Sequence, residues 1–121
     1  MNGKQKGKRG ELDLVEQLRT AGYANARRTA QYCGNTGDAP DITGIDGLHI
    51  ECKRREQIQD EVFLQQAEKE AKKGLIPIVM YRRSREQWKV CLRLNVFMAI
   101  WSELTELQRY KIMEKIKFIR Q

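Results

Sequence analysis

Residues 40–53, PDITGIDGLHIECK, constrain the fold more than any other stretch, because they predict one particular β-hairpin. A two-residue turn at Asp46-Gly47 would place Asp41 opposite Cys52 and would put Glu51 on the other side of the sheet. A three-residue loop over 45–47, with Gly47 in the left-handed conformation, places Asp41 opposite Glu51 instead.

The second register separates polar from apolar side chains, which alternate between the two faces of a strand. One face then holds Asp41, Thr43, His49, Glu51 and Lys53, and the other holds Ile42, Gly44, Leu48, Ile50 and Cys52. A slip of one residue would mix the two sets. We therefore expect the register in which Asp41 and Glu51 are opposed.

Opposed residues in this register have Cβ atoms about 4.5–5.5 Å apart. Two carboxylates that close repel each other unless a cation lies between them. Asp41 and Glu51 could therefore hold a hard divalent ion such as Mg²⁺, with Lys53 stabilising negative charge on a substrate. The alternative is an exposed hairpin whose Glu51–Lys53 charge pair stabilises the fold by about a few tenths of a kcal/mol.

The segment from Gly10 to Ala21 predicts an amphipathic helix with Val15 and Leu18 on its buried face. Glu11 lies one turn before Val15, so we expect it to point inward at the start of that face. The alternative is that Glu11 simply favours the positive end of the helix.

The remaining pattern predicts one α/β domain with helices packed on a central sheet. We expect strands over 25–33, 75–81 and 88–94 beside the hairpin, and helices over 61–73, 95–101 and 105–119. We expect residues 1–9 to form a flexible basic arm before a domain over 10–121, with its core in 10–94 and C-terminal helices in 95–121. The apolar stripe over 112–119 indicates either core packing or a dimer interface.

The formal net charge of +7 suits a polyanionic partner such as nucleic acid, although a basic surface can also serve solubility alone. Lys4, Lys6, Lys8 and Arg9 concentrate this charge near the N-terminus. No run of 18 or more apolar residues exists, and no apolar segment follows the basic start, so neither a membrane helix nor a secretory signal is expected. The three cysteines lack CxxC spacing, which favours free thiols in a reducing cytoplasm.

At Pro40-Asp41 and Glu51-Cys52-Lys53 the chain resembles the PD-(D/E)XK nuclease superfamily. The order of its motifs is similar to that of the compact archaeal-type Holliday-junction resolvases and their phage-like relatives. These carry a basic, glycine-containing start with an inward glutamate, here 7–11, and an arginine-rich first strand, here Arg27-Arg28. A helix bearing a glutamine follows the hairpin, here Gln66 with Gln65 as the poorer fit.

The resemblance implies a restriction-endonuclease-like fold and a Mg²⁺-dependent endonuclease, with Mn²⁺ as a substitute. It implies Asp41 and Glu51 as metal ligands, Glu11 as a direct or water-mediated ligand, Lys53 acting on the nucleophile or phosphate, and Gln66 orienting these groups. DNA would contact Lys4, Lys6, Lys8, Arg9, Arg27 and Arg28. Resolvases of this kind act as symmetric dimers, so we expect a homodimer.

Two alternatives stay open at this point. One is a nuclease of the same fold that acts on flaps, nicks or duplex DNA, and the other is a DNA-binding module without catalysis. His49 is also open, since it lies on the predicted active face either as a phosphate contact or as a hydrogen-bonded strand residue.

Overall fold

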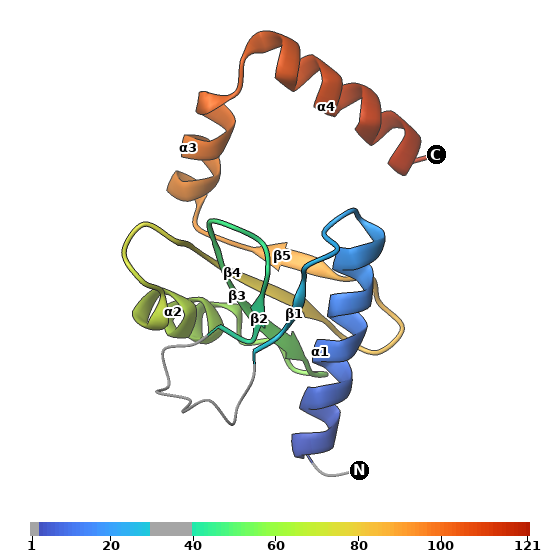
Figure 1. Ribbon diagram of the computed structural model, residues 1–121, viewed down its shortest axis with the longest axis vertical. Helices are drawn as coiled ribbons and strands as arrows, with labels where there is room; N and C mark the ends of the chain where they lie inside the picture. The colour runs from blue at the N-terminus through green and yellow to red at the C-terminus, as the bar shows by residue number, and fades with distance from the viewer. Residues whose placement is uncertain (1–2, 30–39) are drawn as a thin grey trace.

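The computed structural model describes residues 3–29 and 40–121, with side chains from residue 7 onward (Figure 1). The helices and strands follow in the order α1 (Gly3–Thr20), β1 (Arg27–Arg28), β2 (Ile42–Thr43), β3 (Leu48–Arg54), α2 (Asp60–Glu70), β4 (Ile76–Arg82), β5 (Lys89–Cys91), α3 (Leu94–Glu103) and α4 (Glu106–Ile119). This order confirms the expected α/β architecture.

The five strands form one sheet in the order β1-β2-β3-β4-β5. Neighbouring strands are antiparallel except β3 and β4, which are parallel. A parallel pair needs a crossover connection, and α2 supplies it. Pro77, which cannot donate a ladder hydrogen bond, lies in β4 opposite His49 of β3 and before the residues that pair with β5.

The two faces of the sheet are covered by different helices (Figure 1). Leu14 and Val15 of α1 pack with Ile42, Ile50, Cys52, Ile78 and Met80 in one core cluster. Phe63, Leu64 and Ala67 of α2 pack with Val79 in the other. The side chains of β3 therefore alternate between the α1 face and the α2 face.

The hairpin adopts the predicted register where its strands pair, since Ile42 lies opposite Ile50. Asp41 directly precedes β2, and its charge lies close to Glu51. Gly47 has the expected positive φ of 89°. Gly44 also has a positive φ, 98°, and a Cβ there would lie 1.9 Å from the carbonyl oxygen of Asn25. Only glycine fits at Gly44, because the connection between α1 and β1 passes directly against it.

Helix α1 begins at Gly3, so the prediction of a flexible arm over 1–9 is wrong for residues 3–9. The glycines suggested a flexible segment because each one weakens a helix by about 1 kcal/mol. Gly3, Gly7 and Gly10 instead have the spacing of one helix face. A Cβ at Gly10 would lie 2.8 Å from the Cβ of Arg54, so the missing side chain lets α1 approach the end of β3.

Several predicted helices and strands are longer than the observed ones. The first strand is confined to β1 in the described residues, and residues 30–33 of the prediction lie outside them. Helix α2 ends at Glu70 rather than at residue 73. Strand β5 is shorter than the predicted range 88–94. Trp88 and Leu92 pack on the α1 face as the alternation predicted. Val90 is exposed, because β5 is an edge strand.

Helices α3 and α4 project from the body formed by the sheet, α1 and α2 (Figure 1). The predicted capping box begins α4, because the Thr105 hydroxyl accepts from the Gln108 backbone and the Gln108 side chain accepts from the Thr105 backbone. Neither helix contains a buried residue. The stripe that includes Met113, Ile116 and Ile119 is therefore not part of the core of this chain. No helix in the described ranges is long and apolar enough to cross a membrane.

Candidate active site

A pocket of about 570 Å³ opens where β3 ends beside α1 and the start of β2. Its lining brings together residues from three separate parts of the chain: Gly7, Glu11, Asp41, Cys52, Lys53, Arg54 and Arg55. Three of the predicted site residues, Glu11, Asp41 and Lys53, are among them. The hairpin and the N-terminal helix thus place acidic and basic side chains around one cavity.

Asp41 is fixed by the strand ladder and by its own side chain. Its backbone N–H donates to the Ile50 carbonyl at 2.9 Å, and its Oδ2 accepts from the Cys52 N–H at 2.8 Å. One carboxylate oxygen is therefore anchored to β3, while the residue still lines the pocket.

Glu11 faces inward, as its helical position predicted. Its Oε1 accepts from Nε of Arg28 at 2.7 Å, and both side chains are largely shielded from solvent. Burial raises the pKa of Glu11, and the hydrogen bond from Arg28 opposes that rise. Arg28, which we expected on the DNA-binding surface, thus forms an ion pair with the acidic group of the pocket.

Lys53 and Gln66 meet across the β3–α2 contact. The Gln66 Oε1 accepts from the Lys53 Nζ at 3.2 Å, while its Nε2 donates to Glu70 at 3.4 Å. The Lys53 ammonium also lies 5.0 Å from the centre of the Phe63 ring. Gln66, the glutamine that the resemblance singled out, thus bonds to the lysine, whereas Gln65 bonds to Glu61.

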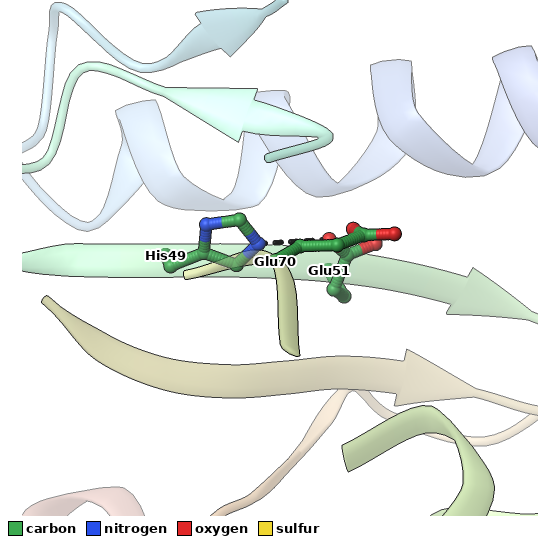
Figure 2. A group of neighbouring side chains, drawn as sticks. All are labelled: His49, Glu51 and Glu70. Atoms are coloured by element: carbon green, nitrogen blue, oxygen red, sulfur yellow. Dashed lines mark hydrogen bonds and ion pairs between the residues drawn. The ribbon is translucent and has the colours of Figure 1, made fainter. Parts of the chain in front are cut away.

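Glu51 is almost fully buried, with 1% of its surface exposed, and it does not line the pocket. Its Oε1 lies 2.9 Å from Nε2 of His49, which is equally buried. Glu70, the last residue of α2, completes a cluster whose ligand atoms all lie within 4.8 Å of one another (Figure 2). Figure 2 shows the imidazole and the two carboxylates converging beside β3.

The electrostatics of this cluster follow from its burial. Burial raises the pKa of Glu51 strongly, and the nearby charge of Asp41 and the contact with Glu70 raise it further. Burial lowers the pKa of His49, so the imidazole is neutral at physiological pH. His49 is therefore a hydrogen-bonded strand residue rather than an exposed phosphate contact.

The predicted DNA-binding residues are only partly described. Lys8 and Arg9 are exposed on α1, and Arg27 is exposed at the sheet edge, where its guanidinium donates to the Asn25 carbonyl. Lys4 and Lys6 lie in α1, outside the residues whose side chains are described.

Sequence reasoning missed Arg54 and Arg55 at the pocket and Glu70 beside Glu51. The two arginines directly follow the ExK motif, so their position was readable from the sequence. Glu70 lies one helical turn after Gln66, on the same face of α2. That spacing could have identified it once Gln66 had been assigned to the site.

The donor set fits a hard divalent cation. Glu11, Asp41 and Glu51 supply carboxylate oxygens, the ligands that Mg²⁺ and Mn²⁺ prefer. Among the described residues, neither Asp41 nor Glu51 forms an ion pair with a lysine or arginine. A bound cation would balance the negative charge that these side chains bring together.

Two comparisons place the chain among known proteins. The profile of a family described as "Phage putative PDDEXK endonuclease" matches residues 2–119. The structure also resembles Hjc, a Holliday junction resolvase from the hyperthermophilic archaeon Archaeoglobus fulgidus, with 32% identity, a TM-score of 0.52, and coverage of 68% of this chain and 72% of that one. This likeness confirms the restriction-endonuclease-like fold. No curated protein gives a significant match. The chain belongs to the phage putative PDDEXK endonuclease family, whose nucleases depend on a divalent metal ion.

Proposed function

We propose that this protein is a Mg²⁺-dependent endodeoxyribonuclease that cleaves branched DNA, with the four-way Holliday junction as its preferred substrate. The observation that carries the proposal is the convergence of Glu11, Asp41 and Lys53 on one pocket beside Glu51. The likeness to an archaeal Holliday junction resolvase at 32% identity supports the choice of substrate.

In this proposal Asp41 and Glu51 hold the metal ion, and Glu11 holds it directly or through water. A divalent ion bound there would polarise the scissile phosphate and lower the pKa of water. The hydrogen bond from the Cys52 N–H to Asp41 keeps that carboxylate oriented during turnover. The Arg28 guanidinium restrains Glu11 and opposes the rise in its pKa that burial causes.

Lys53 acts on the reacting groups while Gln66 holds its ammonium in place. Water adds to phosphorus and the bridging P–O bond breaks, which leaves a phosphomonoester and a hydroxyl. Lys53 orients the attacking water or stabilises the charge that develops on the phosphoryl oxygens. Arg54 and Arg55 lie at the same pocket and supply positive charge for the adjoining phosphates.

DNA binding in this proposal depends mainly on phosphate contacts. Lys8 and Arg9 on α1 and Arg27 at the edge of the sheet are exposed cations on elements next to the pocket. Lys4 and Lys6 extend the basic character of α1 toward the N-terminus. Binding should therefore weaken steeply with salt and show little dependence on base sequence.

The protein acts as a homodimer through α3 and α4 in this proposal. These helices expose large apolar side chains, namely Leu94, Phe97, Met98, Ile100, Leu107, Tyr110, Met113, Ile116, Phe118 and Ile119. Such a concentration of exposed apolar surface is typical of an interface. The family profile extends over this segment, and a second copy suits a substrate with two related scissile strands.

Sedimentation velocity tests the dimer directly. Wild-type protein should sediment at twice the monomer mass of 14.2 kDa. Met113→Glu with Ile116→Glu should give monomer, because both changes place charge on the exposed apolar face. A wild-type monomer at micromolar concentration would contradict this part of the proposal.

A panel of matched DNA substrates tests the function. A four-way junction, a flap, a nicked duplex and a linear duplex would be incubated with Mg²⁺, with Mn²⁺ and with EDTA. Paired symmetric nicks in the junction, lost in EDTA, are the expected result. Cleavage of the flap or duplex instead would support nuclease activity but contradict the junction as the preferred substrate. Tight binding without cleavage of any substrate would favour a DNA-binding module.

A further inference from the structure

The proposed mechanism uses only part of the cluster formed by His49, Glu51 and Glu70. Glu51 is a proposed ligand of the catalytic metal ion, but His49 and Glu70 have no role in that mechanism. His49 and Glu51 are two residues apart on β3, so both project toward α2, where Glu70 ends the helix (Figure 2). Strand and helix thus supply three potential ligands from opposite sides.

The spacing of these ligand atoms suits a metal ion. Transition-metal ions bind imidazole nitrogen and carboxylate oxygen at about 2.0–2.2 Å, so adjacent ligands in one coordination sphere lie roughly 3 Å apart. The His49 Nε2 and the Glu51 Oε1 are 2.9 Å apart, and all three ligand atoms lie within 4.8 Å of one another. Small side-chain adjustments would bring all three around one ion.

The charges around the cluster also call for a cation. In the described residues, no lysine or arginine forms an ion pair with Asp41, Glu51 or Glu70. Lys53, the lysine of the proposed mechanism, donates to the neutral amide of Gln66. Buried carboxylates are normally protonated, paired or bound to metal, because an isolated buried charge is strongly unfavourable, so a cation bound here would take the place of a proton.

We propose that His49, Glu51 and Glu70 bind a second divalent cation beside the pocket, with Glu51 shared between the two metal positions. The imidazole nitrogen selects a transition-metal ion of the Mn²⁺ class rather than Ca²⁺, which prefers oxygen ligands alone. Glu70 is only half-buried at the end of α2, so the ion reaches the cluster from that side. The inference deepens the proposed function, because it rests on Glu51 also serving the pocket.

A spectroscopic test is available because the chain contains a single histidine. Mn²⁺ would be added to the untagged full-length protein, and pulsed electron paramagnetic resonance would record the coupling of the Mn²⁺ electron spin to nitrogen. Imidazole coupling can arise only from His49. The expected result is such a coupling in the wild type and also in Asp41→Asn, which removes a pocket carboxylate but none of the three ligands of the cluster.

Variants on α2 provide the matched comparison. Glu70→Gln should weaken the Mn²⁺ site that shows nitrogen coupling by at least about tenfold, since one charged ligand is lost. Glu68→Gln removes a carboxylate from the same helix, but Glu68 pairs with Arg93 and should leave that site unchanged. Equal loss in both variants would contradict the assignment.

The outcomes separate this inference from the proposed function. Mn²⁺ binding and DNA cleavage without nitrogen coupling in the wild type would overturn the second site and leave the nuclease intact. Nitrogen coupling without cleavage of any substrate would support the second site and overturn the proposed function. Absence of Mn²⁺ binding would overturn both.

Discussion

The side chain of Gln66 accepts a hydrogen bond from the Lys53 ammonium at 3.2 Å, and this contact joins the crossover helix to the strand that carries the ExK motif. The same amide donates to Glu70 at 3.4 Å. Gln66 therefore connects the pocket to the buried cluster beside it, and it fixes the direction of a lysine that would otherwise have several rotamers.

Gln66→Ala should lower kcat by about 10- to 100-fold with little change in KM, because Lys53 loses its positioning contact but DNA loses none. Gln65→Ala is the matched control, since Gln65 is exposed on the same helix and bonds to Glu61 instead. Steady-state cleavage kinetics would measure both. Equal effects of the two substitutions would contradict a positioning role for Gln66.

The buried Glu51 predicts how stability depends on pH. Its pKa is raised from the ordinary value of 4.5, mainly by burial, so the folded state keeps a proton that the unfolded chain has lost. The metal-free protein should therefore lose stability as pH rises above that value. Glu51→Gln should abolish most of this loss and stabilise the metal-free protein at about pH 8 by more than roughly 1 kcal/mol.

Thermal melts in EDTA would test this between about pH 7 and about pH 9, a range above the ordinary histidine pKa of 6.5. Burial lowers the pKa of His49 further, so His49 stays neutral throughout and does not obscure the result. A wild-type stability that rises with pH across this range would contradict a buried, protonated Glu51.

Two glycines of the hairpin provide a test of the fold. Gly44 and Gly47 both have positive φ, but a Cβ at Gly44 would lie 1.9 Å from the Asn25 carbonyl oxygen, whereas nothing lies within 4 Å of a Cβ at Gly47. Gly47→Ala should destabilise by about 1–2 kcal/mol from backbone strain alone. Gly44→Ala should lower the free energy of unfolding by clearly more, because the connection between α1 and β1 must also move. Urea denaturation would rank the two, and similar losses would contradict the close approach.

The basic face of α1 is tested by the salt dependence of binding. Lys8→Gln and Arg9→Gln should each reduce the slope of log K against log salt by about 1, because each removes one phosphate contact. Lys117→Gln is the control. Lys117 lies on α4, far from α1 in the sequence, and it already pairs with Glu114. Fluorescence anisotropy with a labelled junction would measure the slopes. Unchanged slopes for Lys8 and Arg9 would remove α1 from the DNA interface.

The hairpin could be predicted because alternating polarity and one turn glycine determine its register. That register pairs Ile42 with Ile50 and so brings Asp41 near Glu51, and the period of two then gives the direction of Lys53. Gln66 followed from the resemblance to known resolvases. These residues depend on local patterns, which a sequence displays directly.

Other features depend on contacts between distant segments. Helix α1 begins earlier than predicted, and its Gly10 packs against Arg54, a contact that no local propensity encodes. Glu70 joins Glu51 only through the packing of α2 on the sheet. The exposure of α3 and α4 could not be predicted either, because an apolar stripe has the same sequence pattern whether it faces the core or a second copy.

Cleavage of a four-way DNA junction by wild type and by Asp41→Asn, each with Mg²⁺ and with EDTA, tests the central claim most directly. The Asp41 carboxylate contributes a proposed metal ligand while its neighbours on β3 hold it in place. Asp41→Asn should reduce cleavage at least about 100-fold and leave junction binding intact. Wild-type cleavage that persists in EDTA, or full activity in Asp41→Asn, would contradict the assignment of a metal-dependent site to this pocket.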